Sequence, residues 1–124
     1  MLVRELLDTK GHDVYSVSPD TTAFDALKIM AEKEIGALVV LEKDKMVGIM
    51  SERDYARKVI LKGKASTETR VREIMTTDVI HMGPDYKLRD CLSLMTKHHI
   101  RHIPIIEGDK PVGILSIEDV KRVT

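Results

Sequence analysis

The same pattern of residues occurs twice in the sequence, and this internal repeat constrains the fold more than any other feature. From residue 14 onward the second copy follows the first by 65 residues, so that Pro19-Asp20 aligns with Pro84-Asp85 and Val47-Gly48-Ile49 aligns with Val112-Gly113-Ile114. Chance does not align proline, glycine and aspartate at so many positions, and the sequence therefore predicts a tandem duplication. We expect a first repeat at residues 1–61, a linker at 62–70 and a second repeat at 71–124.

Each repeat predicts the element order β-α-β-β-α, which makes the fold class α/β (α+β). A short extended run precedes a helix whose apolar positions recur at i, i+4 and i+7, and two apolar strand-like runs and a second helix follow. These elements are expected at 14–17, 22–34, 37–41, 46–50 and 52–61, and again at 79–82, 87–98, 103–106, 111–115 and 117–123. A unit of about 60 residues is marginally stable alone, so we expect the repeats to pack by their sheets about a pseudo-twofold axis, with clefts between them.

The composition excludes several classes of function. Lys and Arg number 20 together, as do Asp and Glu, and this neutral balance argues against a general nucleic-acid binder. A single cysteine, Cys91, cannot form an intramolecular disulfide, and the longest apolar runs are too short for a membrane helix. We therefore expect a cytoplasmic protein with no nucleic-acid or membrane partner.

A Ser-x-x-Asp motif follows the last strand of each repeat, as Ser51 to Asp54 and as Ser116 to Asp119. One interpretation is a ligand site, in which the start of the helix faces a phosphate and the aspartate accepts hydrogen bonds from ribose hydroxyls. The other is a capping box, in which serine and aspartate bind each other's backbone amides. Since a cap would be duplicated together with its repeat, the duplication alone does not decide between the two.

Other candidate residues fit a structural role better than a chemical one. His98, His99 and His102 could suggest a metal site, but the repeat places the first two at a helix end and the third in the next strand. Cys91 falls on the apolar side of its helix, as expected of a packed thiol. No Ser/His/Asp or Cys/His arrangement has a sequence context for catalysis. We predict no metal, no catalytic residue and no catalytic cofactor.

Five segments of the sequence resemble those of a known family, and the resemblance extends over essentially the whole chain. They are Gly48–Asp54, Gly113–Asp119, Ile35–Val40, Arg101–Ile105 and Val71–Thr76. On these segments the chain resembles a tandem pair of CBS domains (a Bateman module), and is similar to small stand-alone CBS-pair proteins of bacteria and plant organelles. The resemblance implies an adenosine-containing ligand such as AMP, ADP, ATP, NAD or S-adenosylmethionine.

The resemblance also implies roles for residues at matching positions. Asp54 and Asp119 would bind ribose hydroxyls, adenine would lie against the strand entries of either repeat, and nearby cations would face the phosphates. The implied ligand-binding residues are Lys10, Val14, Ser16, Ile35, Gly36, Ala37, Ser51, Arg53, Asp54, Ile80, Arg101, His102, Ile103, Pro104, Ser116 and Asp119. Because the side chains that could bind phosphate are divided unequally between the repeats, we expect one complete nucleotide site per chain rather than two equal ones.

We therefore expect a non-enzymatic sensor that binds an adenine nucleotide and signals to an unknown partner protein. A homodimer is expected as well, formed through second helices that expose Tyr55, Val59, Ile60 and Val120. The alternative is a dimeric interaction or scaffold protein without ligand, whose Ser-x-x-Asp motifs are helix caps only.

Overall fold

Two units make up the computed structural model, which describes residues 1–124, and the boundaries of these units differ from those of the repeats. The continuous unit is Tyr15–Val79, whereas the split unit combines Met1–Val14 with Ile80–Thr124. Each unit has its own apolar core, so each buries its own sheet and helices. The predicted mixed α/β class is confirmed, while the repeat boundaries at 1–61 and 71–124 stay a prediction about the duplication.

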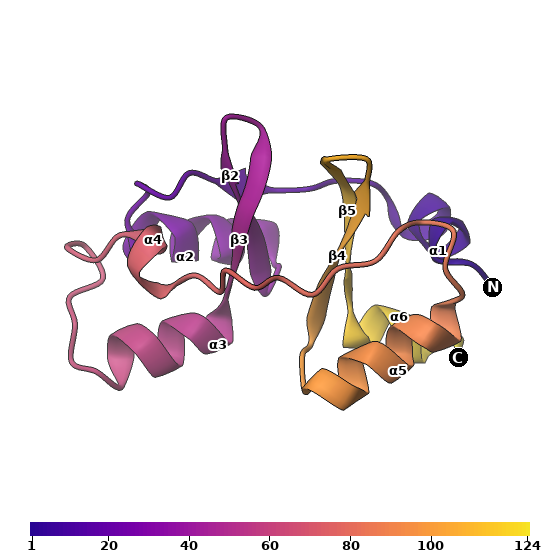
Figure 1. Cartoon of the computed structure of the whole chain (residues 1–124). Helices are drawn as coiled ribbons and strands as arrows, with labels where there is room; N and C mark the ends of the chain where they lie inside the picture. Colours follow the sequence, from indigo (N-terminus) through magenta and orange to yellow (C-terminus); the bar gives the residue numbers. More distant parts are fainter. The chain divides into compact units, whose positions relative to one another are not determined.

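The continuous unit contains a three-stranded sheet with the order β1-β2-β3, in which β1 is parallel to β2 and β2 is antiparallel to β3. Its elements are β1 (Ser16–Val17), α2 (Ala23–Lys33), β2 (Ala37–Glu42), β3 (Lys45–Ser51), α3 (Glu52–Tyr55), the π-helix η1 (Ala56–Ile60) and α4 (Val71–Ile74) (Figure 1). Residues 37–40 are all buried, as the unbroken apolar run predicts.

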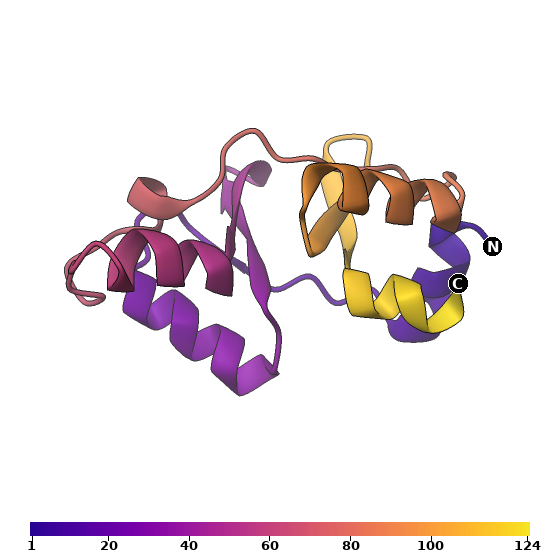
Figure 2. The same cartoon turned by 90° about the horizontal axis from the view of Figure 1, so that it is seen from below.

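The split unit contains the antiparallel pair β4 (His102–Glu107) and β5 (Lys110–Ser116), together with α1 (Val3–Lys10), α5 (Leu88–His98) and α6 (Ile117–Val123). Helices α5 and α6 pack against each other in this unit (Figure 2). The strand predicted at 79–82 is wrong in extent. Only Met82 pairs with the sheet, through a single parallel bridge to Ile105.

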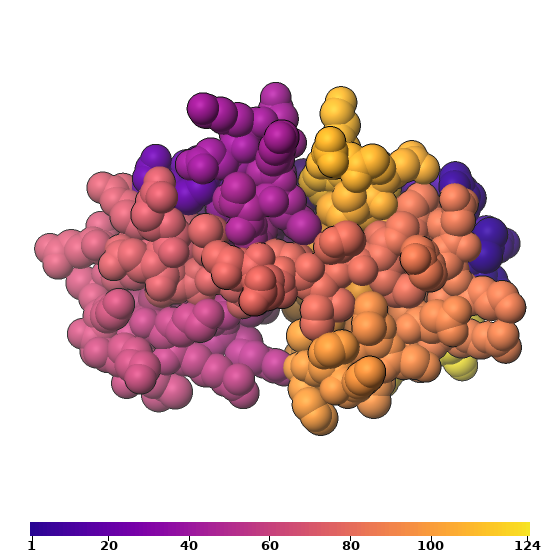
Figure 3. Space-filling model, viewed as in Figure 1, coloured from indigo at the N-terminus to yellow at the C-terminus, as the bar shows by residue number.

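The two hairpins have the same register, as expected of duplicated segments. Ala37 lies opposite Ser51 in one unit and His102 lies opposite Ser116 in the other. Each pairing has one irregularity, after Val40 and after Ile105, and the hairpin turns lie beyond it. The tips of both hairpins stand out from the surface of their units (Figure 3). The hairpins therefore hold both Ser-x-x-Asp motifs in equivalent places.

The opening helix of each repeat packs in the unit that contains the core of the other repeat, an exchange that the predicted β-α-β-β-α order does not include. In α1 the amides of Val3 and Arg4 donate to the carbonyls of Tyr86 and Pro84, each at 2.9 Å. In α4 the equivalent amides donate to the carbonyls of Thr21 and Pro19, at 2.8 and 2.9 Å. Matching ion pairs, Arg4 with Asp85 and Arg72 with Asp20, accompany these bonds. Residues 1–14 therefore complete the split unit.

The segment 62–70, predicted as a polar linker, is folded onto the continuous unit. The carbonyls of Thr69 and Ser66 accept hydrogen bonds from the first two amides of α2, at 2.8 and 3.0 Å. The Tyr55 hydroxyl lies 2.7 Å from the Ser66 hydroxyl, and Thr69 is only 4% exposed. This segment thus caps α2.

The helix predicted at 52–61 changes character after its first turn, because residues 56–60 form the π-helix η1. The predicted exposure of Val59 and Val120 is wrong, since both side chains are fully buried. Ile60 is exposed, and so is its neighbour Leu61. The large exposed apolar side chains therefore lie at the end of this helical segment.

Candidate functional site

Asp119 lies at the centre of the best-defined polar group in the split unit. Its Oδ2 atom accepts a hydrogen bond from the Ser116 amide at 2.9 Å, while the Asp119 amide donates to the Ser116 hydroxyl at 3.1 Å. This reciprocal pair is a complete capping box at the start of α6. The capping interpretation of the motif is therefore realised in the structure.

Lys10 joins this group from the last turn of α1. Its Nζ atom lies 3.1 Å from Asp119 Oδ2 and also donates to the carbonyl of Ile114. The Asp119 side chain is 15% exposed, and that of Lys10 is 33% exposed. Burial alone would raise the pKa of Asp119, but the Ser116 amide and the Lys10 ammonium outweigh it, so that this pKa lies below its ordinary value.

Asp54 is the equivalent residue of the continuous unit, and both of its carboxylate oxygens are occupied. Oδ2 accepts hydrogen bonds from the Ser51 amide at 3.0 Å and the Ser51 hydroxyl at 3.1 Å. Oδ1 accepts a hydrogen bond from the Thr76 hydroxyl at 3.3 Å and pairs with Lys58 Nζ at 3.0 Å. The two aspartates therefore have the same cap but different surroundings.

The amides at the starts of α3 and α6 do not form the open phosphate-binding surface that the sequence suggested. The amide of Glu52 donates to the carbonyl of Gly36 at 3.0 Å, and that of Ile117 donates to the carbonyl of Arg101 at 2.8 Å. The serine and aspartate amides are used by the capping boxes. Three amides at each helix start are thus bound by the protein itself.

The cations predicted to face phosphates have different surroundings. The guanidinium of Arg101 forms an ion pair with Glu118, and both side chains are about half exposed. Arg53 is exposed in α3, and His102 is half-buried at the start of β4. Lys10 binds one of the two predicted ribose-binding aspartates, Asp119.

The residues predicted to contact adenine differ in how deeply they are buried. Ile103, Pro104 and Ala37 are buried, whereas Ile35 and Gly36 are half-buried. Val14 and Ile80 are half-buried in the split unit, and Ser16 is exposed at the start of β1. Because the predicted site residues divide between the two units, a cleft shared by both repeats stays a prediction.

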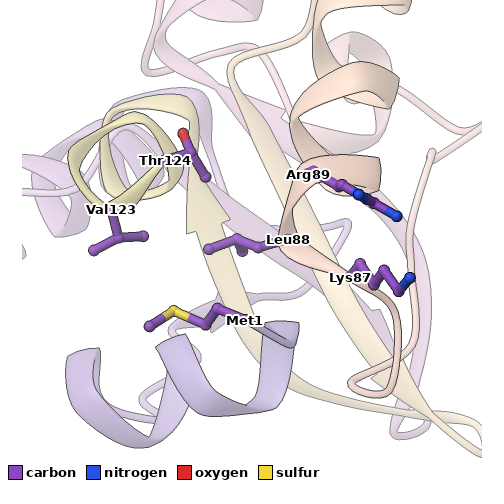
Figure 4. Close-up of a pocket in the computed structure, with 6 residues that line it drawn as sticks. All are labelled: Met1, Lys87, Leu88, Arg89, Val123 and Thr124. Atoms are coloured by element: carbon purple, nitrogen blue, oxygen red, sulfur yellow. The ribbon is translucent and has the colours of Figure 1, made fainter.

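One pocket of about 340 Å³ lies in the split unit, away from the predicted residues. It is lined by Met1, Lys87, Leu88, Arg89, Val123 and Thr124. The apolar side chains among them face one another, whereas the two cations point away (Figure 4). The sequence offered no signal for it, because its walls come from three separate segments.

No group of three or more histidine, cysteine, aspartate or glutamate side chains is placed to hold a metal ion. His98 ends α5 and His99 takes the left-handed conformation that terminates the helix. His102, in contrast, begins β4. None of the helices has the length and hydropathy needed to cross a lipid bilayer.

The chain resembles proteins from plants and bacteria. It is 43% identical over 108 residues to the mitochondrial CBS domain-containing protein CBSX3 of Arabidopsis thaliana, covering 83% of this chain and 52% of that protein. This chain thus spans about half the length of that relative. It matches a putative signal-transduction protein with CBS domains from Burkholderia ambifaria with a TM-score of 0.94 and 42% identity, covering 98% and 92% of the two chains.

Two more distant structures extend the comparison. The CBS domain pair of protein MJ0100, solved in complex with 5′-methylthioadenosine and S-adenosyl-L-methionine, matches with a TM-score of 0.89 and 26% identity over 99% of this chain and 94% of that one. A hexameric CBS-CP12 protein from bloom-forming cyanobacteria matches with a TM-score of 0.90 and 27% identity, covering 100% of this chain and 72% of that one.

The family comparison agrees with the duplication and with the equivalent hairpins and caps of the two units. Residues 3–61 and 71–124 each match the CBS domain. The resemblance inferred from the five sequence segments is thereby confirmed, and the chain belongs to the CBS domain family as a tandem pair.

Proposed function

We propose that the chain is a non-catalytic regulatory module that binds an adenosine-containing ligand through Asp119 and passes the binding event to a partner protein. The observation that carries this proposal is the difference between the two aspartates. The Ser116 amide and Lys10 both contact Oδ2 of Asp119, so that Oδ1 is the oxygen assigned in this proposal to the two ribose hydroxyls. At Asp54 the protein occupies both oxygens. One site per chain, in the split unit, follows from this difference.

The comparisons support the class of ligand. A CBS pair of the same fold binds 5′-methylthioadenosine and S-adenosyl-L-methionine, two ligands that share adenine and ribose. Ribose offers two neighbouring hydroxyl donors, which a carboxylate accepts well because it is charged. AMP, ADP, ATP and NAD carry the same ribose and belong to the proposed ligand set. Membership of the CBS domain family favours a binding role over catalysis.

A second function is favoured by a specific observation, the completeness of both capping boxes. If the aspartates serve only as caps, the chain is a dimeric interaction or scaffold protein with no ligand. This alternative predicts that adenosine compounds leave the melting temperature unchanged.

The experiment that separates the two functions is a melting-temperature series with AMP, ATP, NAD and S-adenosylmethionine, with GMP as the control. A ligand at 100 times its Kd stabilises the folded state by about 2.7 kcal/mol, which corresponds to roughly 5–10 °C for a chain of this size. We expect such a shift with at least one adenosine ligand and none with GMP. Equal shifts with AMP and GMP would contradict adenine recognition, and no shift with any compound would support the scaffold function.

Assembly and location complete the proposal. We propose a homodimer in the cytoplasm, in which ligand binding alters the surface presented to the regulated protein. Native mass spectrometry of freshly purified protein would report a co-purified nucleotide and the oligomeric state together.

A further inference from the structure

We infer that Lys10 selects phosphorylated adenosine ligands over neutral and cationic ones, because its ammonium group contacts the carboxylate proposed to bind ribose. This inference rests on the proposed function, since it takes Asp119 as the ribose-binding residue. It adds the charge of the ligand, which the comparisons leave open.

The first step of the argument is the contact itself. Lys10 Nζ lies 3.1 Å from Asp119 Oδ2 and is bound on its other side by the carbonyl of Ile114. Asp119 is mostly buried, so water screens this pair less than it screens an exposed ion pair. A ribose hydroxyl that approaches Asp119 must therefore share the carboxylate with an ammonium group.

The second step concerns the position from which Lys10 reaches the carboxylate. Helix α1 is anchored in the split unit through the buried side chain of Leu7, which packs on Gly113. The helix stops at Gly11, where φ is +117°. The backbone of Lys10 is thus fixed, while its ammonium swings on a flexible four-carbon stem. A 5′-phosphate bound near the ribose could therefore take over this ammonium without any movement of the helix.

The third step is the state of the neighbouring charges. Arg101 is already paired with Glu118, and the His12 ring lies between Asp8 and the carbonyl of Val112. Hydrogen bonding to Asp8, and to a smaller extent to the carbonyl of Val112, raises the pKa of His12. A charged His12 ring is therefore already bound by these two groups. Lys10 is consequently the cation in direct contact with the proposed ribose-binding carboxylate. It would attract a phosphate and repel the sulfonium and ammonium groups of S-adenosylmethionine.

The other unit supplies a matched control. Lys58 also pairs with an aspartate, Asp54, at 3.0 Å, and also donates to a backbone carbonyl, that of Ile74. However, Lys58 and Asp54 belong to the same helical segment, and the second oxygen of Asp54 is already used by Ser51. Substitution of Lys58 therefore perturbs an equivalent ion pair without touching the proposed site.

The test measures affinities by calorimetry for adenosine, AMP and S-adenosylmethionine in the parent, Lys10→Gln, Lys10→Arg and Lys58→Gln. At about pH 7.5 the phosphate of AMP carries close to two charges. The parent is expected to bind AMP about ten- to a hundredfold more tightly than adenosine, the effect of one charge-assisted hydrogen bond. In Lys10→Gln this ratio should fall close to one, adenosine should bind at least as tightly as before, and S-adenosylmethionine should bind more tightly. Lys10→Arg and Lys58→Gln should keep most of the preference for AMP.

Other outcomes distinguish this inference from the proposed function. If Lys10→Gln binds both ligands with the parental ratio, the selectivity role of Lys10 is wrong while nucleotide binding stands. If the parent binds no adenosine compound, the proposed function fails and the inference fails with it. Should Lys10→Gln not fold, Lys10→Met supplies the test, because methionine keeps an apolar stem of similar length and removes the charge. The preference for AMP must then fall close to one, and an unchanged preference would overturn the inference.

Discussion

Leu7 in α1 and Gly113 in β5 touch so closely that a Cβ atom on Gly113 would lie 2.5 Å from Leu7 Cδ2. Leu7 is 1% exposed, so its branched side chain has little room to move away. Gly113→Ala should therefore lower the free energy of unfolding by about 1–3 kcal/mol, as overpacking does elsewhere. Urea denaturation of the parent and the variant would measure this difference.

A double-mutant cycle shows whether this cost comes from Leu7. Leu7→Ala alone should cost about 2–5 kcal/mol, because it leaves a cavity in the core. In the Leu7→Ala background the methyl group added by Gly113→Ala has space, so the cost of that substitution should largely disappear, with a coupling of about 1–2 kcal/mol. Strict additivity of the two substitutions would show that the contact does not limit the packing of α1.

Asp119→Asn and Asp54→Asn separate ribose binding from capping. Asparagine keeps the size and the acceptor oxygen of a cap, so both variants should melt within a few degrees of the parent. Asp119→Asn should weaken AMP binding by about 30- to 1,000-fold, the loss of roughly 2–4 kcal/mol from two charge-assisted hydrogen bonds. Asp54→Asn should have a much smaller effect, because the protein itself uses both of its oxygens. Calorimetry with AMP decides, and parental affinity in both variants would leave the motifs as caps only.

The ion pair at Asp119 should also contribute to stability in a pH-dependent way. The pKa of Asp119 in the folded chain is lower than its ordinary value of 3.8, so the charged form stabilises the fold above that range. This contribution should be lost as the pH falls through the folded pKa, when the carboxyl takes up a proton. The gap in unfolding free energy between parent and Asp119→Asn should therefore be larger at about pH 6 than at about pH 3. A gap that does not change over this range would contradict the assignment.

Cys91 should react only when the split unit opens. Its side chain is fully buried, and burial raises the pKa of the thiol to about 11. At about pH 8 roughly one thiol in a thousand would carry the reactive negative charge. Alkylation with iodoacetamide, followed by mass spectrometry, should be slow in buffer and fast in concentrated urea. Equal rates in the two solvents would show that the thiol is accessible in the folded chain.

A homodimer of about twice 14.0 kDa is expected in solution. Ile60 and Leu61, 56% and 77% exposed, form the apolar surface at the end of η1 on which this association would depend. Leu61→Asp should shift the mass measured by light scattering toward that of the monomer, whereas Tyr86→Ser, at an exposed residue of the split unit, should not. A monomeric parent at micromolar concentration, with and without AMP, would refute the dimer.

The strands and long helices were predictable because their signals are local. The apolar runs at 37–41 and 103–106 lie within one residue of β2 and β4 at each end, and α5 differs by one residue from its predicted start. The caps were predictable for the same reason, since serine and aspartate are three residues apart. The duplication strengthened each assignment because the same local pattern occurs in both repeats.

The exchange of α1 and α4 was not predictable in this way. A helix of four or eight residues has little stability in isolation, and these two depend on backbone hydrogen bonds to distant residues such as Tyr86 and Thr21. The pairing of Lys10 with Asp119 depends on the same exchange, although both residues were singled out separately. A usable signal was present in the repeated arginines, Arg4 and Arg72, which pair with the aspartates of the Pro-Asp turns.

The division of the split unit into two segments sets the order in which the chain can fold during synthesis. All contacts within Tyr15–Val79 can form once that stretch has left the ribosome, which synthesises and releases the chain from its N-terminus. Helix α1 emerges before the other elements of its unit, yet its packing partner Gly113 is made more than a hundred residues later. For most of translation the apolar face of α1 therefore has no partner within its own unit. A segment that is synthesised before the rest of its unit is thus among the last parts of that unit to be buried.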